Sequence, residues 1–116
     1  MDSKKILRAA YDAISDKKGE NIKIIDISGI SVIADYFIVT NGTSTSHVKA
    51  ISDNVQEKLA GLGVSVLRTE GYTSASWILM DFGNIIVHVF SKNDRLFYDL
   101  ERIWSDGRLI AIEDLQ

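Results

Sequence analysis

The amino-acid sequence predicts a single α/β domain in which helices flank a mixed β-sheet. Helical and strand-like hydrophobic patterns alternate along the chain, as they do in α/β folds. No proline, low-complexity tract or repeat marks an internal linker. The length of 116 residues, with 46% hydrophobic and 25% charged residues, is that of one ordinary domain with its own core. We therefore expect residues 1–116 to form one unit.

The first two elements are predicted to be a helix over residues 2–18 and a strand over residues 22–27. Apolar residues recur at helical spacing after Asp2 and Ser3, either of which can cap the helix, and Gly19 stands just past its end. The strand is a β-branched run that stops at Ser28 and Gly29. We expect this strand to lie at or near an edge of the sheet.

A central strand is predicted over residues 35–40, because both alternating sets of its positions are apolar. A turn then leads into a helix over residues 44–62, with Gly63 as its stop. The strand, turn and helix in this order suggest an α/β unit. A further strand is expected over residues 64–70, followed by a polar loop over residues 71–76.

The most informative segment is a predicted hairpin, with strands over residues 77–81 and 85–90 and a tight turn at Gly83 and Asn84. Alternation divides its side chains between two faces of the sheet. One face is wholly apolar and must be core: Ile78, Met80, Phe82, Ile85, Val87 and Val89. The other face is mixed, so it is either covered by a polar-rimmed layer or used for binding: Trp77, Leu79, Asp81, Ile86, His88 and Phe90.

A last helix is predicted from Ser91 to the Asp106-Gly107 pair, with Asp94 completing a variant capping box. Its buried stripe consists of Leu96, Phe97, Leu100, Ile103 and Trp104. Tyr98 points away from that stripe, beside Arg95 and Arg102, a composition that protein interfaces favour. The tail over residues 109–115 is too short for its pattern to be assigned.

Composition narrows the function classes. The chain has no cysteine, which excludes a disulfide framework, thiolate catalysis and cysteine-ligated metals. It shows neither a signal peptide nor an apolar run long enough to cross a membrane, so we expect a cytoplasmic protein without membrane contact. The net charge of −3 and the absence of a Lys/Arg cluster argue against direct nucleic-acid binding. A basic protein partner suits this charge better.

No catalytic or metal-binding constellation is evident. Gly42 and Ser44 could hold an anion at a helix start, but we favour a turn with a serine N-cap as their explanation. Asp81 lacks the second carboxylate that two-metal chemistry requires. For His88 we favour a hydrogen-bonded structural or interface histidine over a ligand or base. Trp77 is either core or an interface anchor, since tryptophan is enriched among binding hot spots. We expect no cofactor, no metal and no enzymatic activity.

Seven segments together resemble the ribosomal silencing factor family, also called the Iojap-related or RsfS family. They cover most of the chain in the family's order: ADYFIV at 34–39 with GTS at 42–44, HVKA at 47–50, EGY at 70–72, WILMDFG at 77–83, VHVF at 87–90 and RLFYDLERIW at 95–104. The last of these segments is specific to the family.

The resemblance implies a nucleotidyltransferase-like fold that lacks the catalytic carboxylates, usually found as a homodimer. It implies binding to the large ribosomal subunit through its protein fourteen, which sterically blocks joining of the small subunit and so represses translation. From the sidedness of the predicted elements, the partner-binding residues are expected to be Trp77, Leu79, Asp81, His88, Arg95, Tyr98 and Arg102.

Two other functions stay open at this point. A large-subunit assembly factor would share the partner and act earlier. A nucleotide-binding or nucleotidyltransferase-like enzyme would use Gly42, Ser44 and Asp81.

Overall fold

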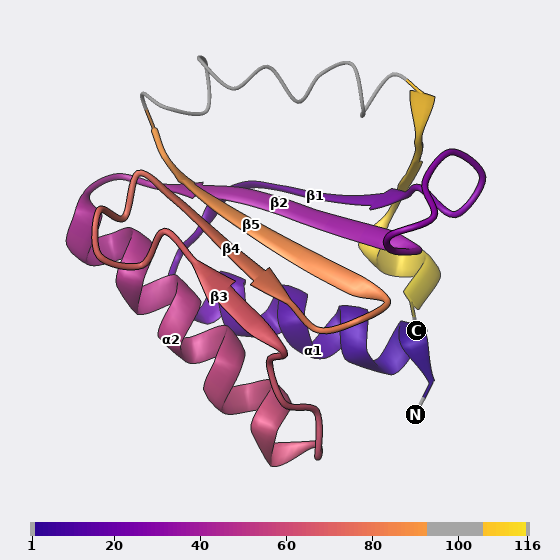
Figure 1. The fold of residues 1–116 in the computed structure, drawn as a ribbon, viewed down its shortest axis with the longest axis horizontal. Coiled ribbons are helices and arrows are strands. Elements are labelled where there is room, and N and C mark those ends of the chain that lie inside the picture. Colours follow the sequence, from indigo (N-terminus) through magenta and orange to yellow (C-terminus); the bar gives the residue numbers. More distant parts are fainter. Residues whose placement is uncertain (1, 93–105, 116) are drawn as a thin grey trace.

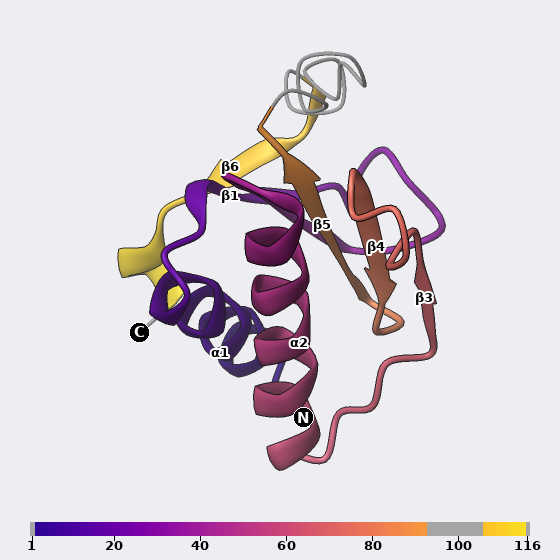
Figure 2. The same cartoon turned by 90° about the vertical axis from the view of Figure 1, so that its left-hand side faces the viewer.

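The structure, a computed structural model, describes residues 2–92 and 106–115. Two helices lie on the same side of a curved sheet (Figures 1 and 2). The helices are α1 (Ser3–Asp16) and α2 (Thr45–Gly61), and a short 3-10 helix, η1 (Ile112–Leu115), lies near the C-terminus. The strands are β1 (Glu20–Asp26), β2 (Tyr36–Gly42), β3 (Arg68–Glu70), β4 (Trp77–Asp81), β5 (Ile85–Ser91) and β6 (Arg108–Ile110). The predicted α/β fold with a mixed sheet is confirmed.

The six strands follow the order β3-β4-β5-β2-β1-β6. Only the β2–β5 pair is parallel among these strands, and every other pair is antiparallel. β2 is therefore interior, as predicted for the central strand. β1 lies next to the edge strand β6, which agrees with its expected place near an edge.

The sheet buries both of its faces. On the helix side, α1 and α2 pack against Ile38, Ile78, Met80, Val87 and Val89. On the opposite side, which we call the outer face, a second apolar cluster comprises Ile25, Ile27, Ala34, Phe37, Val39, Ile86 and Phe90, with Trp77 and Leu79 packed against it. The division of the hairpin side chains between the two faces follows the predicted alternation.

The helix caps also match the sequence. The Asp2 carboxylate accepts from the backbone N–H of Lys4 (3.1 Å), which begins α1. The Ser44 hydroxyl accepts from the N–H of His47 (3.1 Å), which begins α2. Each cap satisfies a backbone donor that the first helical turn leaves unpaired.

Two expectations need correction, and one unassigned segment gains a structure. The strand predicted over residues 64–70 is limited to Arg68–Glu70, because Val64 and Val66 pack against the helix-side core instead of extending the ladder. Ser91 does not begin a helix: it ends β5, where its N–H donates to the Ser76 carbonyl (2.9 Å) and it pairs with Gly42. The unassigned tail forms β6 and η1. The rest of the predicted last helix, residues 93–105, lies outside the described residues.

Candidate functional site

Four of the seven predicted contact residues lie together on the outer face. Trp77, Leu79 and Asp81 come from β4, and His88 comes from the neighbouring strand β5. The register sets Leu79 directly opposite His88 and Trp77 opposite Phe90. Three further predicted contact residues, Arg95, Tyr98 and Arg102, lie outside the described residues.

Trp77 is held in place by aromatic neighbours. Its Nε1–H donates to Nδ1 of His88 (3.1 Å), and its ring stacks on Phe90 with 5.3 Å between centroids and 18° between planes. Phe37 of β2 meets the His88 ring edge-on at 4.6 Å. The indole remains half-buried. It is thus fixed by a hydrogen bond and a stack while part of its surface stays exposed, as an interface anchor requires.

His88 acts as a neutral acceptor. Its residue is 4% exposed, and burial lowers the pKa of its imidazole from 6.5 to about 4. Because Nδ1 accepts from Trp77, the ring proton of the neutral form belongs on Nε2, for which no partner exists among the described residues. These facts agree with a structural histidine. Of these two side chains, Trp77 keeps exposed surface and His88 orients it.

The outer face gains two charged residues that the sequence reasoning missed. β3 pairs with β4 so that Arg68 lies opposite Asp81 and Glu70 opposite Leu79. Arg68 and Glu70 also approach each other at 3.8 Å across exposed side chains. Alternation within the predicted strand put both on one face, but only the strand order places that face beside Leu79 and Asp81. Asp81 itself accepts from the N–H of Gly83 (2.8 Å) and so supports the hairpin turn.

The loop before β4 positions Trp77 through the backbone. Gly71 has a φ of 82°, and a Cβ added there would overlap the carbonyl oxygen of Trp77. The following Tyr72 turns toward the helix side, where its hydroxyl donates to the Asp53 carboxylate (3.1 Å) and Lys49 lies over its ring. Hydrogen bonding to Asp53 raises the pKa of the Tyr72 hydroxyl. Tyr72 therefore contacts α2 and does not lie on the outer face.

The residues required for a nucleotide site do not converge. Asp81 pairs with Ile86 of β5, and Ile86 pairs in turn with Phe37 of β2. Gly42 lies five residues beyond Phe37 along β2. At the rise of a β-strand this separates them by about 16 Å. The N–H of Thr43 already donates to His47 Nδ1 (2.9 Å), and the N–H of His47 donates to the Ser44 hydroxyl. Two donors that an anion would use at the start of α2 are therefore occupied within the chain.

His47 has a structural role that the sequence did not predict. Besides accepting from Thr43, its ring places Nε2 at 2.6 Å from the carbonyl oxygen of Lys17. This side chain therefore joins the end of α1 to the start of α2. Across residues 2–92 and 106–115, no group of three or more His, Asp or Glu residues could hold a metal ion. In the same residues, no helix has the length and apolar character that a membrane crossing requires.

Comparison with known proteins places this chain in a family. A family profile described as "Ribosomal silencing factor during starvation" matches residues 1–116. The chain belongs to the ribosomal silencing factor family. Ribosomal silencing factor RsfS of Bacillus subtilis is 39% identical over 113 residues, which cover 97% of this chain and 96% of the relative. RsfS of Halalkalibacterium halodurans is 37% identical over 113 residues, covering 97% of each chain.

The same family fold appears among solved structures. A crystal structure of a protein from Chromobacterium violaceum superposes with a TM-score of 0.88 at 35% identity, covering 96% of this chain and 92% of the other. A crystal structure from Bacillus halodurans gives a TM-score of 0.82 at 34% identity, covering 92% of this chain and 97% of the other. The resemblance to ribosomal silencing factors inferred from the sequence is therefore confirmed.

Proposed function

We propose that this protein binds the large ribosomal subunit through its protein fourteen and sterically blocks joining of the small subunit, which represses translation. Family membership supports a silencing role, since relatives at 37–39% identity are named ribosomal silencing factors. The mechanism needs affinity and bulk at the joining surface and no bond making, so the protein acts without catalysis, in the cytoplasm.

The observation that carries the proposal is the Trp77 platform on the outer face. Trp77 is half-buried and oriented by His88 and Phe90, and it lies beside Leu79 and Asp81. A rigid, partly exposed tryptophan loses little conformational entropy when a partner covers it. The contact would be made mainly to protein, with little or no direct contact to ribosomal RNA. A homodimer is part of the proposal, with each copy presenting one such platform.

The first test is co-sedimentation of the purified protein with isolated large subunits, followed by addition of small subunits and measurement of the joined fraction on a gradient. Trp77→Ala should weaken subunit binding by at least about 30-fold, corresponding to the roughly 2 kcal/mol expected for a hot-spot residue. It should also restore joining.

Tyr72→Ala is the matched control, because Tyr72 is an exposed aromatic residue nearby that faces α2 instead of the outer face. This variant should bind as the wild type does. If the wild-type protein neither sediments with large subunits nor lowers joining, the proposed function is wrong. If the wild type binds and lowers joining and Trp77→Ala does so equally well, the silencing function stands and the contact lies elsewhere on the protein.

A further inference from the structure

The connection between β1 and β2, residues 27–35, exposes an unusual amount of apolar surface. Ile30 is 52% exposed, Ile33 is 68% exposed and Val32 is completely exposed. The loop projects at one end of the sheet (Figure 1). Single exposed apolar residues are common on soluble proteins, whereas a cluster of three within four positions marks a candidate interaction site.

The loop is held in shape by its own hydrogen bonds. The N–H groups of Ile30 and Ser31 both donate to the carbonyl of Ile27 (3.0 and 2.9 Å), and the N–H of Ile27 donates to the carbonyl of Asp35 (2.9 Å). The apolar side chains are therefore presented on a formed backbone, which lowers the entropy lost when a partner binds.

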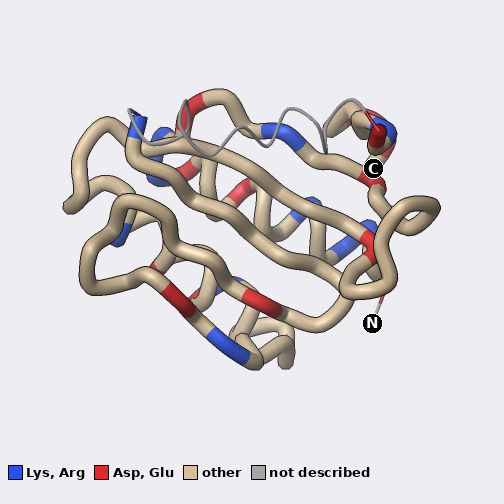
Figure 3. The backbone as a smooth tube through the Cα atoms, turned by 45° about the horizontal axis from the view of Figure 1, so that its top comes forward, with Lys and Arg blue, Asp and Glu red and all other residues tan. Residues whose placement is uncertain are grey.

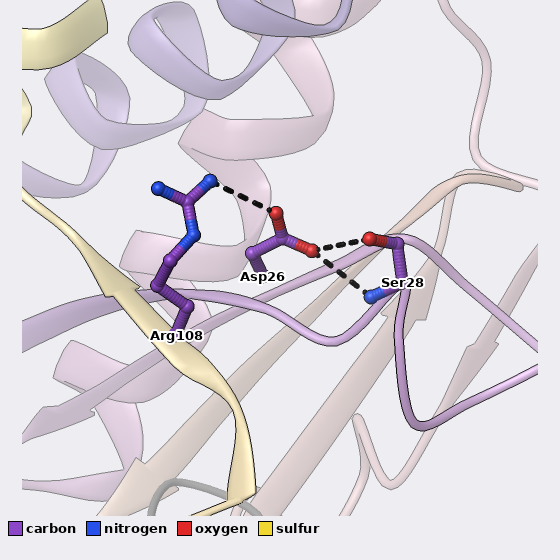
Figure 4. Close-up of polar contacts among 3 residues, drawn as sticks. All are labelled: Asp26, Ser28 and Arg108. Carbon is purple, nitrogen blue, oxygen red and sulfur yellow. Dashed lines mark hydrogen bonds and ion pairs between the residues drawn. The ribbon is translucent and has the colours of Figure 1, made fainter.

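Asp26 anchors the base of the loop, as Figure 4 shows. One carboxylate oxygen accepts from the hydroxyl and the N–H of Ser28 (2.6 and 3.0 Å), and the other accepts from Arg108 of β6 (3.2 Å). The bonds from Ser28, with a smaller contribution from Arg108, hold the pKa of this carboxyl below its usual value. The charged form of Asp26 thus fixes the path of the chain as it leaves β1.

The loop continues the outer face. The N–H groups of Asp35 and Tyr36 donate to the carbonyl of Asn84 in the β4–β5 turn (2.9 and 3.0 Å), and Ala34 packs in the outer-face cluster. This is the end of the sheet at which Asp81 lies. The apolar loop and the region of Leu79 and Asp81 therefore form neighbouring parts of one surface.

Among the described residues, this surface carries a net negative charge: Asp35 and Asp81 are acidic, and Arg68, which lies opposite Asp81, is balanced by Glu70 at 3.8 Å. Between residues 28 and 46 the only charged side chain is Asp35, and between residues 71 and 91 the only one is Asp81, since His88 is neutral. Figure 3 shows the projecting loop without a Lys or Arg. Most basic residues belong to α1 and α2 or the turn after α1: Lys4, Lys5, Arg8, Lys17, Lys18, Lys49 and Lys58.

We infer that the loop is an apolar anchor for a basic ribosomal protein. Ile30, Val32 and Ile33 enter an apolar depression on that protein, and Asp35 and Asp81 face Lys or Arg side chains around it. A surround with a net negative charge favours a cationic protein surface and disfavours an anionic membrane. The inference rests on the proposed function and extends its contact surface from Trp77 along the outer face to the β1–β2 loop.

The test measures binding of a Val32→Ser/Ile33→Ser double variant to isolated large subunits, alongside self-association by light scattering. Removing two exposed apolar side chains should leave folding unchanged and weaken subunit binding at least about tenfold, because each contributes apolar area that the complex would bury. The matched control is Leu67→Ser, because Leu67 is also an exposed apolar residue, 72% exposed. Leu67 precedes β3 and shares the side of Thr69, which faces α2 and accepts a hydrogen bond from Gln56 of that helix. It should bind normally.

Each outcome decides the inference. Weakened subunit binding by the double variant, with normal binding by Leu67→Ser and unchanged self-association, supports it. Wild-type affinity in the double variant overturns it while the proposed function stands. A variant that loses self-association but keeps subunit binding overturns it by assigning the loop to a contact between copies. Equal losses in both variants overturn it as non-specific, and failure of the wild type to bind overturns it together with the proposed function.

Discussion

The buried His88 makes stability depend on pH in a defined direction. In the unfolded chain its imidazole should titrate near its ordinary value of 6.5, whereas in the folded protein its pKa is about 4. Between these values the unfolded state binds more protons than the folded state. The free energy of unfolding therefore rises with pH in this window, and stability is lost as the pH falls from about 6.5 to about 4.

The magnitude follows from the size of the shift. One pKa unit corresponds to about 1.4 kcal/mol, so the shift of His88 accounts for about 3 kcal/mol of stability across the window. The structural reason is that Nδ1 accepts from Trp77, so a protonated ring would set two N–H groups against each other in a buried site. Below about pH 4 this contribution should level off.

The assay is urea denaturation followed by circular dichroism at several pH values, on the wild type and on His88→Asn. Asparagine keeps an acceptor near the position of Nδ1 but does not titrate. The difference in unfolding free energy between the two proteins should shift by about 1.4 kcal/mol per pH unit within the window, in favour of the variant as pH falls. Subtraction cancels the other titrating groups. Parallel loss of stability in both proteins would refute the buried, neutral state of His88.

Three further predictions concern residues that hold the backbone in place. Gly71→Ala should lower the free energy of unfolding, measured by urea denaturation, by at least about 2 kcal/mol, because a side chain is strained at the φ of 82° and meets the Trp77 carbonyl. The control Gly61→Ala in α2 has open space around its new methyl group and should be neutral or stabilising. Equal effects of the two substitutions would contradict the close approach of Gly71 to Trp77. His47→Ala should lower the free energy of unfolding by about 1–3 kcal/mol, because the hydrogen bonds to Thr43 and Lys17 are lost, and should leave subunit binding intact. Loss of subunit binding in a folded variant would refute a purely structural role of His47. Asp26→Asn should lower the free energy of unfolding at neutral pH, because a carboxyl with a lowered pKa stabilises the fold only when it is charged. The variant should also lose less stability than the wild type when the pH falls below about 4. Identical acid unfolding curves of the two proteins would contradict this.

The sequence reasoning was strongest where a local period decides the structure. The alternation of residues 77–81 and 85–90 identified which hairpin side chains face the helices, and the structure confirms this in two separate clusters. The caps at Asp2 and Ser44 were equally local. The strand predicted over residues 64–70 was too long, because the β-branched residues Val64 and Val66 belong to a loop that packs against the core.

The candidate site was only partly accessible to such reasoning. Trp77 and His88 were placed on one face, but their hydrogen bond depends on the exact register of β4 against β5. The apolar loop after β1 went unnoticed, because exposure of Ile30, Val32 and Ile33 cannot be read from a short run without a period. Arg68 and Glu70 joined the surface only through the pairing of β3 with β4.

By itself, the sequence determined the class of fold, the order of most described elements, the faces of the central hairpin and the family, since each depends on spacing or on motifs along the chain. The tertiary structure alone decided which strands are neighbours, that Asp81 and Gly42 lie at different levels of the sheet, and that the β1–β2 loop continues the outer face. The physical reason is that strand pairing joins residues far apart in sequence, and periodicity records only which way a side chain points within its own element.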